Sequence, residues 1–311
     1  MAPVILFPAD PLDRSKVDSA FKAEAEAARF VGCSIAFVDI DHDPLDEDLE
    51  ADTIGEPTIY RGWMLTPTRY QWLYETLWER GFRLINSPDE YRYCHELPQW
   101  YDDFKGATPS SKWFKPDPET GFDLPQIARR AHCQLGSGPY VIKDFVKSRK
   151  HEWEEACFIR DGEAIEGVTR RFLELQGDDL AGGLVYRKFV PLKQVGEHPK
   201  SGLPIYNEVR TWTFCGAPLT SHTYWGPDEG GADIIMPRGL IDIVDLSGKG
   251  SAKQPLMDWR VKSNFFTMDL AQHEHGRWVV IELGDGQVSG LPPHADAKEF
   301  YRRLKRRFTF R

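Results

Sequence analysis

Residues 265–292 read FFTMDLAQHEHGRWVVIELGDGQVSGLP, and the rest of the chain is interpreted around this stretch. Its apolar first residues lead to Asp269, after which the polar run His273–Gly276 predicts a turn. The returning segment Trp278–Ile281 is aromatic and β-branched, as in a buried strand, and it ends at Glu282. The stretch therefore predicts a β-hairpin whose two strands each carry a carboxylate.

These carboxylates suggest a metal site. Asp269 and Glu282 are followed by Asp285, which two glycines flank just beyond the second strand. Oxygen ligands held on rigid strands suit Mg²⁺, which usually keeps several waters and bridges to phosphates. An exposed hairpin with scattered acidic residues is the simpler explanation of the stretch taken alone, so the rest of the chain has to decide.

The composition is that of a globular protein without a membrane segment. Of the 311 residues, 41% are hydrophobic and 28% charged, and the net charge is −9. This charge argues against a general nucleic-acid binder, and no apolar run approaches the ~18 residues of a transmembrane helix. The five cysteines form no C-x-x-C pair, and no basic leader precedes Val4–Phe7. We therefore expect free thiols in a reducing compartment, the cytoplasm.

The first third of the chain alternates short apolar segments with helical ones. Strands are expected at Val4–Phe7, Ser34–Val38, Thr58–Tyr60 and Phe82–Ile85, and helices at Arg14–Phe30 and Tyr70–Arg80. The candidate core residues of the second helix are Trp72, Leu73, Leu77 and Trp78. This alternation predicts a small, mostly parallel α/β layer, and the first strand lacks a following G-x-G-x-x-G. The first expected boundary is Gly106–Ser111, which gives an N-terminal domain of residues 1–108.

Residues 109–311 have a different order of elements. Helices are expected at Leu124–Leu135, Ala164–Gln176 and Ala297–Arg307, and strands at Tyr140–Lys143, Leu184–Val190, Asn207–Phe214 and Ser221–Trp225. The loop after Lys143 is basic, and the segment Gly226–Gly231 is rich in glycine. A glycine-rich segment of this kind predicts a mobile connection.

Four segments carry charges that suit a nucleotide and its cation. They are the strand ending in Lys143, the strand Val185–Val190, the triplet Glu208–Arg210, and Asp269 with Glu282. Lysine and arginine neutralise phosphate oxygens, and carboxylates hold the divalent cations that bridge those oxygens. This set resembles the ATP-grasp superfamily, and within it the small stand-alone clade named for two arginines and a lysine, formerly a domain of unknown function. The run Val280–Leu291 is the most specific match.

The resemblance implies an α+β fold, the ATP-grasp fold, preceded by a small α/β pre-ATP-grasp domain. Two subdomains, residues 109–186 and 187–311, would clasp ATP between them. The resemblance covers the chain beyond residue 108 and is looser in the first third.

The resemblance also assigns the phosphate-binding cations. Lys143 matches the strand lysine on the α-phosphate side of ATP, with a catalytic as well as a binding role. Lys147 and Arg149 lie in the loop that covers the phosphates, although a solvated cation is an equal alternative for each. Arg210 would stabilise charge on the transferred phosphate or on the acyl intermediate. Glu208 is its partner in the E-x-R pair, for which a plain cross-strand ion pair is the alternative.

The adenine edge and the cations are assigned in the same way. The hinge strand matches Arg187, Lys188, Phe189 and Val190, whose backbone near Lys188 and Val190 would contact adenine. Asp269 and Glu282 match the ligands of Mg²⁺, or of Mn²⁺ in its place, with Asp285 as a third. The sequence departs from the family at Gly284, where many members have asparagine.

The resemblance implies a carboxylate–amine ligase that forms an amide through an acyl phosphate and releases ADP and phosphate. A catalytically silent ATP-binding sensor or interaction module is the alternative, motivated by Gly284. The expected partners are ATP and a small-molecule, amino-acid or peptide substrate; the substrate and the oligomeric state stay open. Arg61 could contact an anion or belong to a turn, and His273 and His275 suit a solvated turn better than a zinc site.

Overall fold

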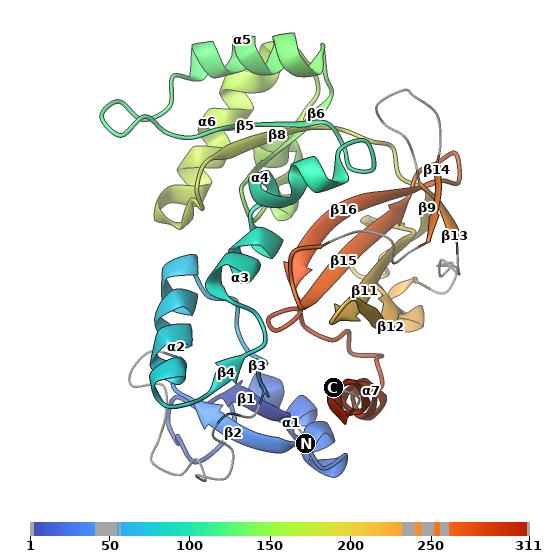
Figure 1. The fold of residues 1–311 in the computed structure, drawn as a ribbon. Helices are drawn as coiled ribbons and strands as arrows, with labels where there is room; N and C mark the ends of the chain where they lie inside the picture. Colours follow the sequence, from blue (N-terminus) through green and yellow to red (C-terminus); the bar gives the residue numbers. More distant parts are fainter. Residues whose placement is uncertain are drawn as a thin grey trace.

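The computed structural model of the protein describes residues 3–40, 55, 57–231, 240–243, 252–255 and 261–309. Figure 1 shows an N-terminal part in blue and cyan, a green part with two helices over a sheet, and a larger sheet in yellow to red. Most of the acidic loop Asp39–Asp52 lies outside the described residues. The described residues form mixed helices and sheets, with an α/β region at the N-terminal end.

The N-terminal sheet is parallel, as expected from the alternating pattern. Its strands are β1 (Val4–Pro8), β2 (Ser34–Val38), β3 (Pro57–Tyr60) and β4 (Arg83–Leu84), in the order β2-β1-β3-β4. The helices of this part are α1 (Lys22–Phe30) and α2 (Pro67–Glu79). All three strand pairs are parallel, which confirms the predicted layer.

Two local predictions in this part were wrong. The helix expected from Arg14 begins only at Lys22, because aspartate side chains upstream accept backbone hydrogen bonds in turns. Asp10 accepts one from the amide of Leu12 at 2.8 Å. Trp78, expected in the core, is 49% exposed. The guanidinium carbon of Arg83 lies 3.7 Å from the centre of one of its rings.

Two short helices connect this part to the rest of the chain. They are α3 (Pro88–His95) and α4 (Leu97–Trp100), and α3 begins with a capping box between Ser87 and Glu90. Both helices pack against β16 of the large sheet. Their buried side chains share one hydrophobic core with that sheet.

The green part of Figure 1 is a four-stranded antiparallel sheet with two helices. Its strands are β5 (Ser111–Phe114), β6 (Tyr140–Asp144), β7 (Phe158–Ile159) and β8 (Leu184–Lys188), in the order β5-β8-β6-β7. The helices are α5 (Leu124–Leu135) and α6 (Ile165–Gln176). The bounds of α5 are those predicted: the Asp123 side chain caps its start, and Gly136 with φ 89° ends it.

The large sheet has the order β12-β11-β15-β16-β13-β14. Its strands are β11 (Glu208–Phe214), β12 (Ala217–Thr223), β13 (Leu240–Ile243), β14 (Ala252–Pro255), β15 (Phe265–Gln272) and β16 (Trp278–Asp285). A separate hairpin consists of β9 (Gln194–Glu197) and β10 (Pro204–Tyr206). The predicted hairpin of residues 265–292 is therefore the pair β15–β16 at the centre of the sheet.

The last helix, α7 (Ala297–Thr309), returns to the N-terminal part. It contacts α1, and its buried face shares a core with β1. Figure 1 shows α7 beside the blue elements, with the C-terminus near the N-terminus. The predicted division at residue 108 therefore assigns α7 to the second domain, although α7 packs against the first.

The buried side chain of Arg61 contacts residues near both ends of the chain. It is 1% exposed and forms an ion pair with Glu24 at 2.8 Å. Its Nη1 also donates to the carbonyl oxygens of Gly286 at 2.6 Å and Ser289 at 2.8 Å. Of the two interpretations of Arg61, the structural one holds, because its side chain is enclosed and already bonded.

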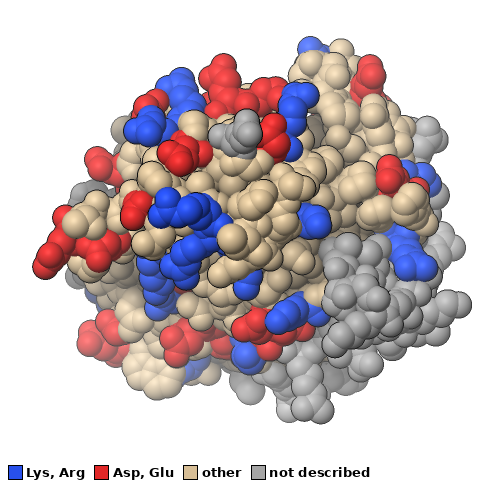
Figure 2. All heavy atoms as spheres, turned by 90° about the horizontal axis from the view of Figure 1, so that it is seen from above, with Lys and Arg blue, Asp and Glu red and all other residues tan. Residues whose placement is uncertain are grey.

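The surface carries both signs of charge. Figure 2 shows Lys and Arg interspersed with Asp and Glu on the face seen from above. None of the helices within the described residues combines the length and the apolar character that a membrane span requires.

Candidate functional site

The three central strands of the large sheet bring charged side chains together. Asp269 on β15 pairs with Glu282 on β16 and with Arg210 on β11. Glu208 lies two positions before Arg210 and therefore on the same face. The four side chains, which the sequence assigned separately, lie on one face of one sheet.

A β-bulge in β16 sets this arrangement. Leu270 pairs with Val280 and Asp269 with Glu282, so Ile281 is an extra residue on its strand. Because of this residue, Val280 joins the core under α3 and α4 while Glu282 points to the opposite face. Simple alternation would have placed Val280 and Glu282 on the same face.

Lys143 reaches this face from the other subdomain. It is at the end of β6, 7% exposed, and its Nζ lies 2.7 Å from Glu282 Oε1. Burial opposes ionisation of Glu282, but the positive charges of Lys143, Lys150 and Arg210 outweigh it and lower its pKa to about 2. The glutamate is therefore ionised at neutral pH and held by the lysine.

Arg210 binds Asp269 through two parallel hydrogen bonds. Nε donates to Oδ1 and Nη2 donates to Oδ2, each at 2.7 Å. The Arg210 guanidinium carbon also lies 5.2 Å from the centre of the Tyr224 ring. Burial lowers the pKa of Arg210, but the Asp269 carboxylate more than offsets this and the net shift is upward. Both predicted metal carboxylates are thus paired with predicted phosphate-binding cations.

Lys150 is a site residue that the sequence did not single out. Its side chain is exposed, and although partial desolvation lowers its pKa, the negative charges of Glu282, Glu208 and Asp269 give a net upward shift, so the ammonium is favoured. Burial raises the pKa of Glu208, and the positive charge of Lys150 only partly opposes this shift. The only sequence signal was the membership of Lys150 in the basic loop after Lys143.

The other two loop cations are not brought into this cluster. The side chain of Arg149 pairs with Glu152 at 3.0 Å. Lys147 is exposed, and its backbone amide donates to Asp144, which closes the turn after β6. Their assignment to phosphate stays a prediction.

The hinge residues divide into two groups. Lys188 is exposed at the end of β8, and Phe189 packs edge-to-face on Phe158 with ring centres 5.3 Å apart. Val190 follows Phe189 beyond the strand and is half-buried. Arg187 points the other way: it is buried and donates to the carbonyl oxygens of β16. Its side chain is therefore committed to the protein interior.

Asp285 is not brought to the other two carboxylates. It lies three positions beyond Glu282, which places it on the opposite face of β16. It is fully buried and accepts hydrogen bonds from Asn86 Nδ2 at 2.7 Å and the amide of Gln287 at 2.8 Å. Burial raises its pKa to about 7, and these bonds only partly oppose the shift. The contacts of Asp285 support the interface between the N-terminal part and β16, in disagreement with its assignment as a metal ligand.

The departure at Gly284 has a steric cause. A Cβ at this position would lie 2.7 Å from Thr267 Oγ1 and 3.0 Å from Ser289 Oγ. These two hydroxyls are hydrogen-bonded to each other at 2.8 Å. They occupy the space that the side chain of an asparagine would need.

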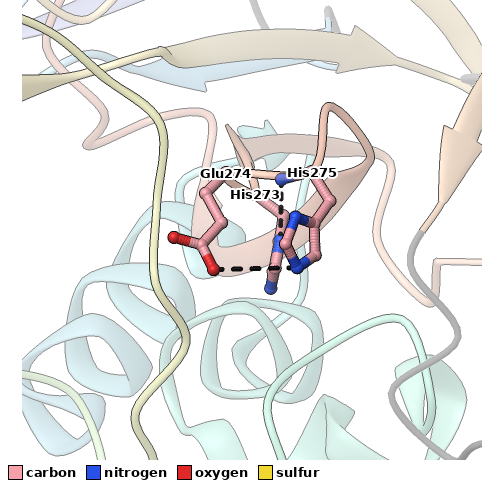
Figure 3. Close-up of side chains that lie close together, drawn as sticks. All are labelled: His273, Glu274 and His275. Carbon is pink, nitrogen blue, oxygen red and sulfur yellow. Dashed lines mark hydrogen bonds and ion pairs between the residues drawn. The ribbon is translucent and has the colours of Figure 1, made fainter.

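A second group of possible ligands lies at the tip of the β15–β16 hairpin. Figure 3 shows the side chains of His273, Glu274 and His275 close together at this tip. One ligand atom from each lies within 4.8 Å of those of the other two. His273 Nδ1 already accepts a hydrogen bond from the amide of His275. The side chains of Glu274 and His275 are 51% and 78% exposed, and this turn fits the solvated interpretation.

Known proteins share this fold over the whole chain. D-cycloserine synthetase DcsG matches with a TM-score of 0.58 and 14% identity, covering 99% of both chains. A RimK domain ATP-grasp protein from Sphaerobacter thermophilus matches with a TM-score of 0.59 and 12% identity, covering 98% of both. The ATP-grasp ligase PsnB, in complex with a minimal precursor, Mg and ADP, matches with a TM-score of 0.51 and 13% identity, covering 97% of this chain and 96% of its own.

The sequence itself gives a more specific assignment. No curated protein matches it significantly. The family model that matches residues 134–304 describes an ATP-grasp domain, family 3 of the clade named for two arginines and a lysine. This range contains Lys143, Arg210, Asp269 and Glu282, and it spans more than half of the chain. The chain therefore belongs to family 3 of this clade of the ATP-grasp superfamily.

Proposed function

We propose that this protein is an ATP- and Mg²⁺-dependent carboxylate–amine ligase. The γ-phosphate of ATP passes to a substrate carboxylate, and ADP leaves. An amine then attacks the acyl carbon, phosphate leaves, and an amide forms. One observation carries the proposal. Lys143, from one subdomain, contacts Glu282 of the other. Asp269 and Arg210 lie beside Glu282 on the neighbouring strands.

The residues present fit a divalent cation. Asp269 and Glu282 offer carboxylate oxygens on adjacent strands, which suits a hard cation that retains water. When bound, Mg²⁺ would neutralise the phosphate oxygens of ATP and hold them for in-line transfer. The structure of PsnB was solved in complex with Mg and ADP, which supports the same requirement here.

The cations of the site have two possible partners, a carboxylate or a phosphate. In this structure Lys143 binds Glu282 and Arg210 binds Asp269, so the lysine and arginine side chains are already aimed at the face where ATP would lie. Phosphate oxygens would replace the carboxylates as acceptors, and Lys150 would add a third positive charge. Chemistry of this kind needs positioning and charge neutralisation, with no nucleophilic side chain.

The substrate is expected to be a small molecule, an amino acid or a peptide. DcsG is named as a synthetase of D-cycloserine, and PsnB was solved with the precursor peptide PsnA2, so the fold accepts either size.

Isotope transfer tests the proposal. The protein is incubated with ATP, Mg²⁺ and pools of amino acids whose carboxylates carry ¹⁸O. An acyl phosphate leaves one ¹⁸O in the released phosphate, and mass spectrometry of the products identifies the amide. Release of phosphate without ¹⁸O would contradict the acyl-phosphate route. ATP binding without any release, across all pools and a mixed metabolite extract, would favour the sensor.

A further inference from the structure

Arg187 is a buried cation whose acceptors are backbone and hydroxyl oxygens. It is 8% exposed, and its three acceptors are the carbonyl oxygens of Ile281 and Val280 and the hydroxyl of Thr108. Among the described residues, no carboxylate forms an ion pair with it. Burial lowers its pKa to about 10, so the guanidinium is still charged at neutral pH.

Its acceptors coincide with the β-bulge of β16. Ile281 is the extra residue of the bulge and has no partner in the β15 ladder. A buried carbonyl outside a ladder needs another donor, and Arg187 Nη1 is that donor for Ile281. On the neighbouring residue, Thr108 Oγ1 donates to the Val280 carbonyl at 2.9 Å, and the Val280 amide donates to Ala107 at 2.8 Å.

The bulge decides where Glu282 points. If the extra residue of β16 lay after Glu282 instead of before it, Glu282 would turn toward the core and away from Lys143 and Asp269. The β15 ladder does not hold Ile281, whereas the contact to Arg187 does. The contact also links two sheets, because Arg187 is on β8 and Ile281 is on β16.

We propose that Arg187 is a positioning residue that holds the bulge of β16 in the register that aims Glu282 at Lys143 and the metal. This inference rests on the proposed function. Its mechanism is the two-carbonyl contact of a planar guanidinium, which a single ammonium cannot reproduce. Arg187 would thus influence the metal site without contacting ATP or Mg²⁺.

The test compares Arg187→Lys with Arg61→Lys. Both change a buried arginine that donates to carbonyl oxygens near β16, but Arg61 contacts the segment beyond Asp285. ATP affinity is measured by calorimetry in EDTA and over a series of Mg²⁺ concentrations. In Arg187→Lys, we expect the Mg²⁺ concentration for half-maximal effect to rise about 10–100-fold, as for other residues that orient metal ligands. Affinity without Mg²⁺ should stay within about twofold of wild type, and Arg61→Lys should leave the Mg²⁺ dependence unchanged.

A second variant separates positioning from folding. In Arg187→Ala, added guanidinium should restore the Mg²⁺ dependence, whereas urea at the same concentration should not. An unchanged Mg²⁺ dependence in Arg187→Lys, or an equal shift in Arg61→Lys, would overturn the role of Arg187 and leave the proposed function intact. Absence of Mg²⁺-dependent ATP binding in wild type would instead refute the proposed function, and this inference with it.

Discussion

Lys143 Nζ lies 2.7 Å from Glu282 Oε1, although the two residues belong to different sheets and different subdomains. The contact joins the two subdomains by an ion pair. It brings the expected phosphate-binding lysine and the expected metal-binding glutamate together. Variants of these two residues, and of two others on or beside β16, test this geometry.

Replacing Lys143 with alanine should weaken ATP binding. The side chain is buried beside Glu282, and its loss removes one charge-assisted contact to a phosphate. We expect a cost of about 1.5–3 kcal/mol in binding free energy, measured by calorimetry. Lys298→Ala, which removes a lysine on α7, is the control and should bind ATP as wild type does. Equal affinity in Lys143→Ala and the control would remove Lys143 from the nucleotide site.

Introducing the family's asparagine at Gly284 should destabilise the protein. The new Cβ would lie 2.7 Å from Thr267 Oγ1, closer than side chains tolerate. We expect Gly284→Asn to cost about 1–3 kcal/mol in unfolding free energy. Adding Thr267→Ala, which removes that hydroxyl, should recover part of the loss in denaturant titrations. A single variant as stable as wild type would show that the hydroxyl pair does not explain the glycine.

Asp285 should make stability depend on pH between about 4 and 7. Its pKa is about 7 in the folded protein, raised by burial, and about 3.9 when unfolded. The folded state therefore binds a proton that the unfolded state releases. This contribution to stability is complete below pH ~4 and is lost as the pH rises through ~7.

Asp285→Asn is the variant that measures this effect. It cannot titrate, so its unfolding free energy should fall less steeply than that of wild type over the window, by at most about 1.4 kcal/mol per pH unit. Parallel pH profiles for the two proteins would contradict the raised pKa.

The hairpin and the boundaries of many elements could be predicted, because apolar periodicity and caps act locally. The helix Leu124–Leu135 is an example: an aspartate precedes it and a glycine ends it. Lys143 could be placed at a strand end for the same reason. The resemblance of the chain to the ATP-grasp superfamily then assigned Glu282 as a metal ligand. The approach of Asp269 to Glu282 followed from the hairpin pattern.

The remaining errors have non-local causes. A strand periodicity of two does not reveal an extra residue, so the bulge at Ile281 and the inward direction of Asp285 were not visible. The sequence placed Arg187 on the hinge strand and left Arg61 as an anion contact or a turn residue, because the acceptors of both are backbone carbonyls from distant segments. The carbonyl groups carry no sequence signal. Lys150 was missed because a basic loop does not show which of its cations faces the opposite sheet.

The central claim is that Glu282 holds the metal of a Mg²⁺–ATP site. Glu282→Gln keeps the shape of the side chain and removes the charge. From the hairpin alone, where Asp269 and Glu282 face each other, the unliganded variant should melt at the same or a higher temperature. Since Lys143 neutralises Glu282 in the structure, we expect a lower midpoint instead.

Thermal melts of wild type and Glu282→Gln, with and without ATP and Mg²⁺, measure this claim most directly. Glu299→Gln, which breaks ion pairs on the surface of α7, is the control and should keep the full ligand effect. Glu282→Gln should lose most of the stabilisation that ATP with Mg²⁺ gives to wild type, because a ligand stabilises only through its affinity for the folded state. If Glu282→Gln gains as much as wild type from ATP with Mg²⁺, Glu282 is a structural partner of Lys143 and the metal binds elsewhere.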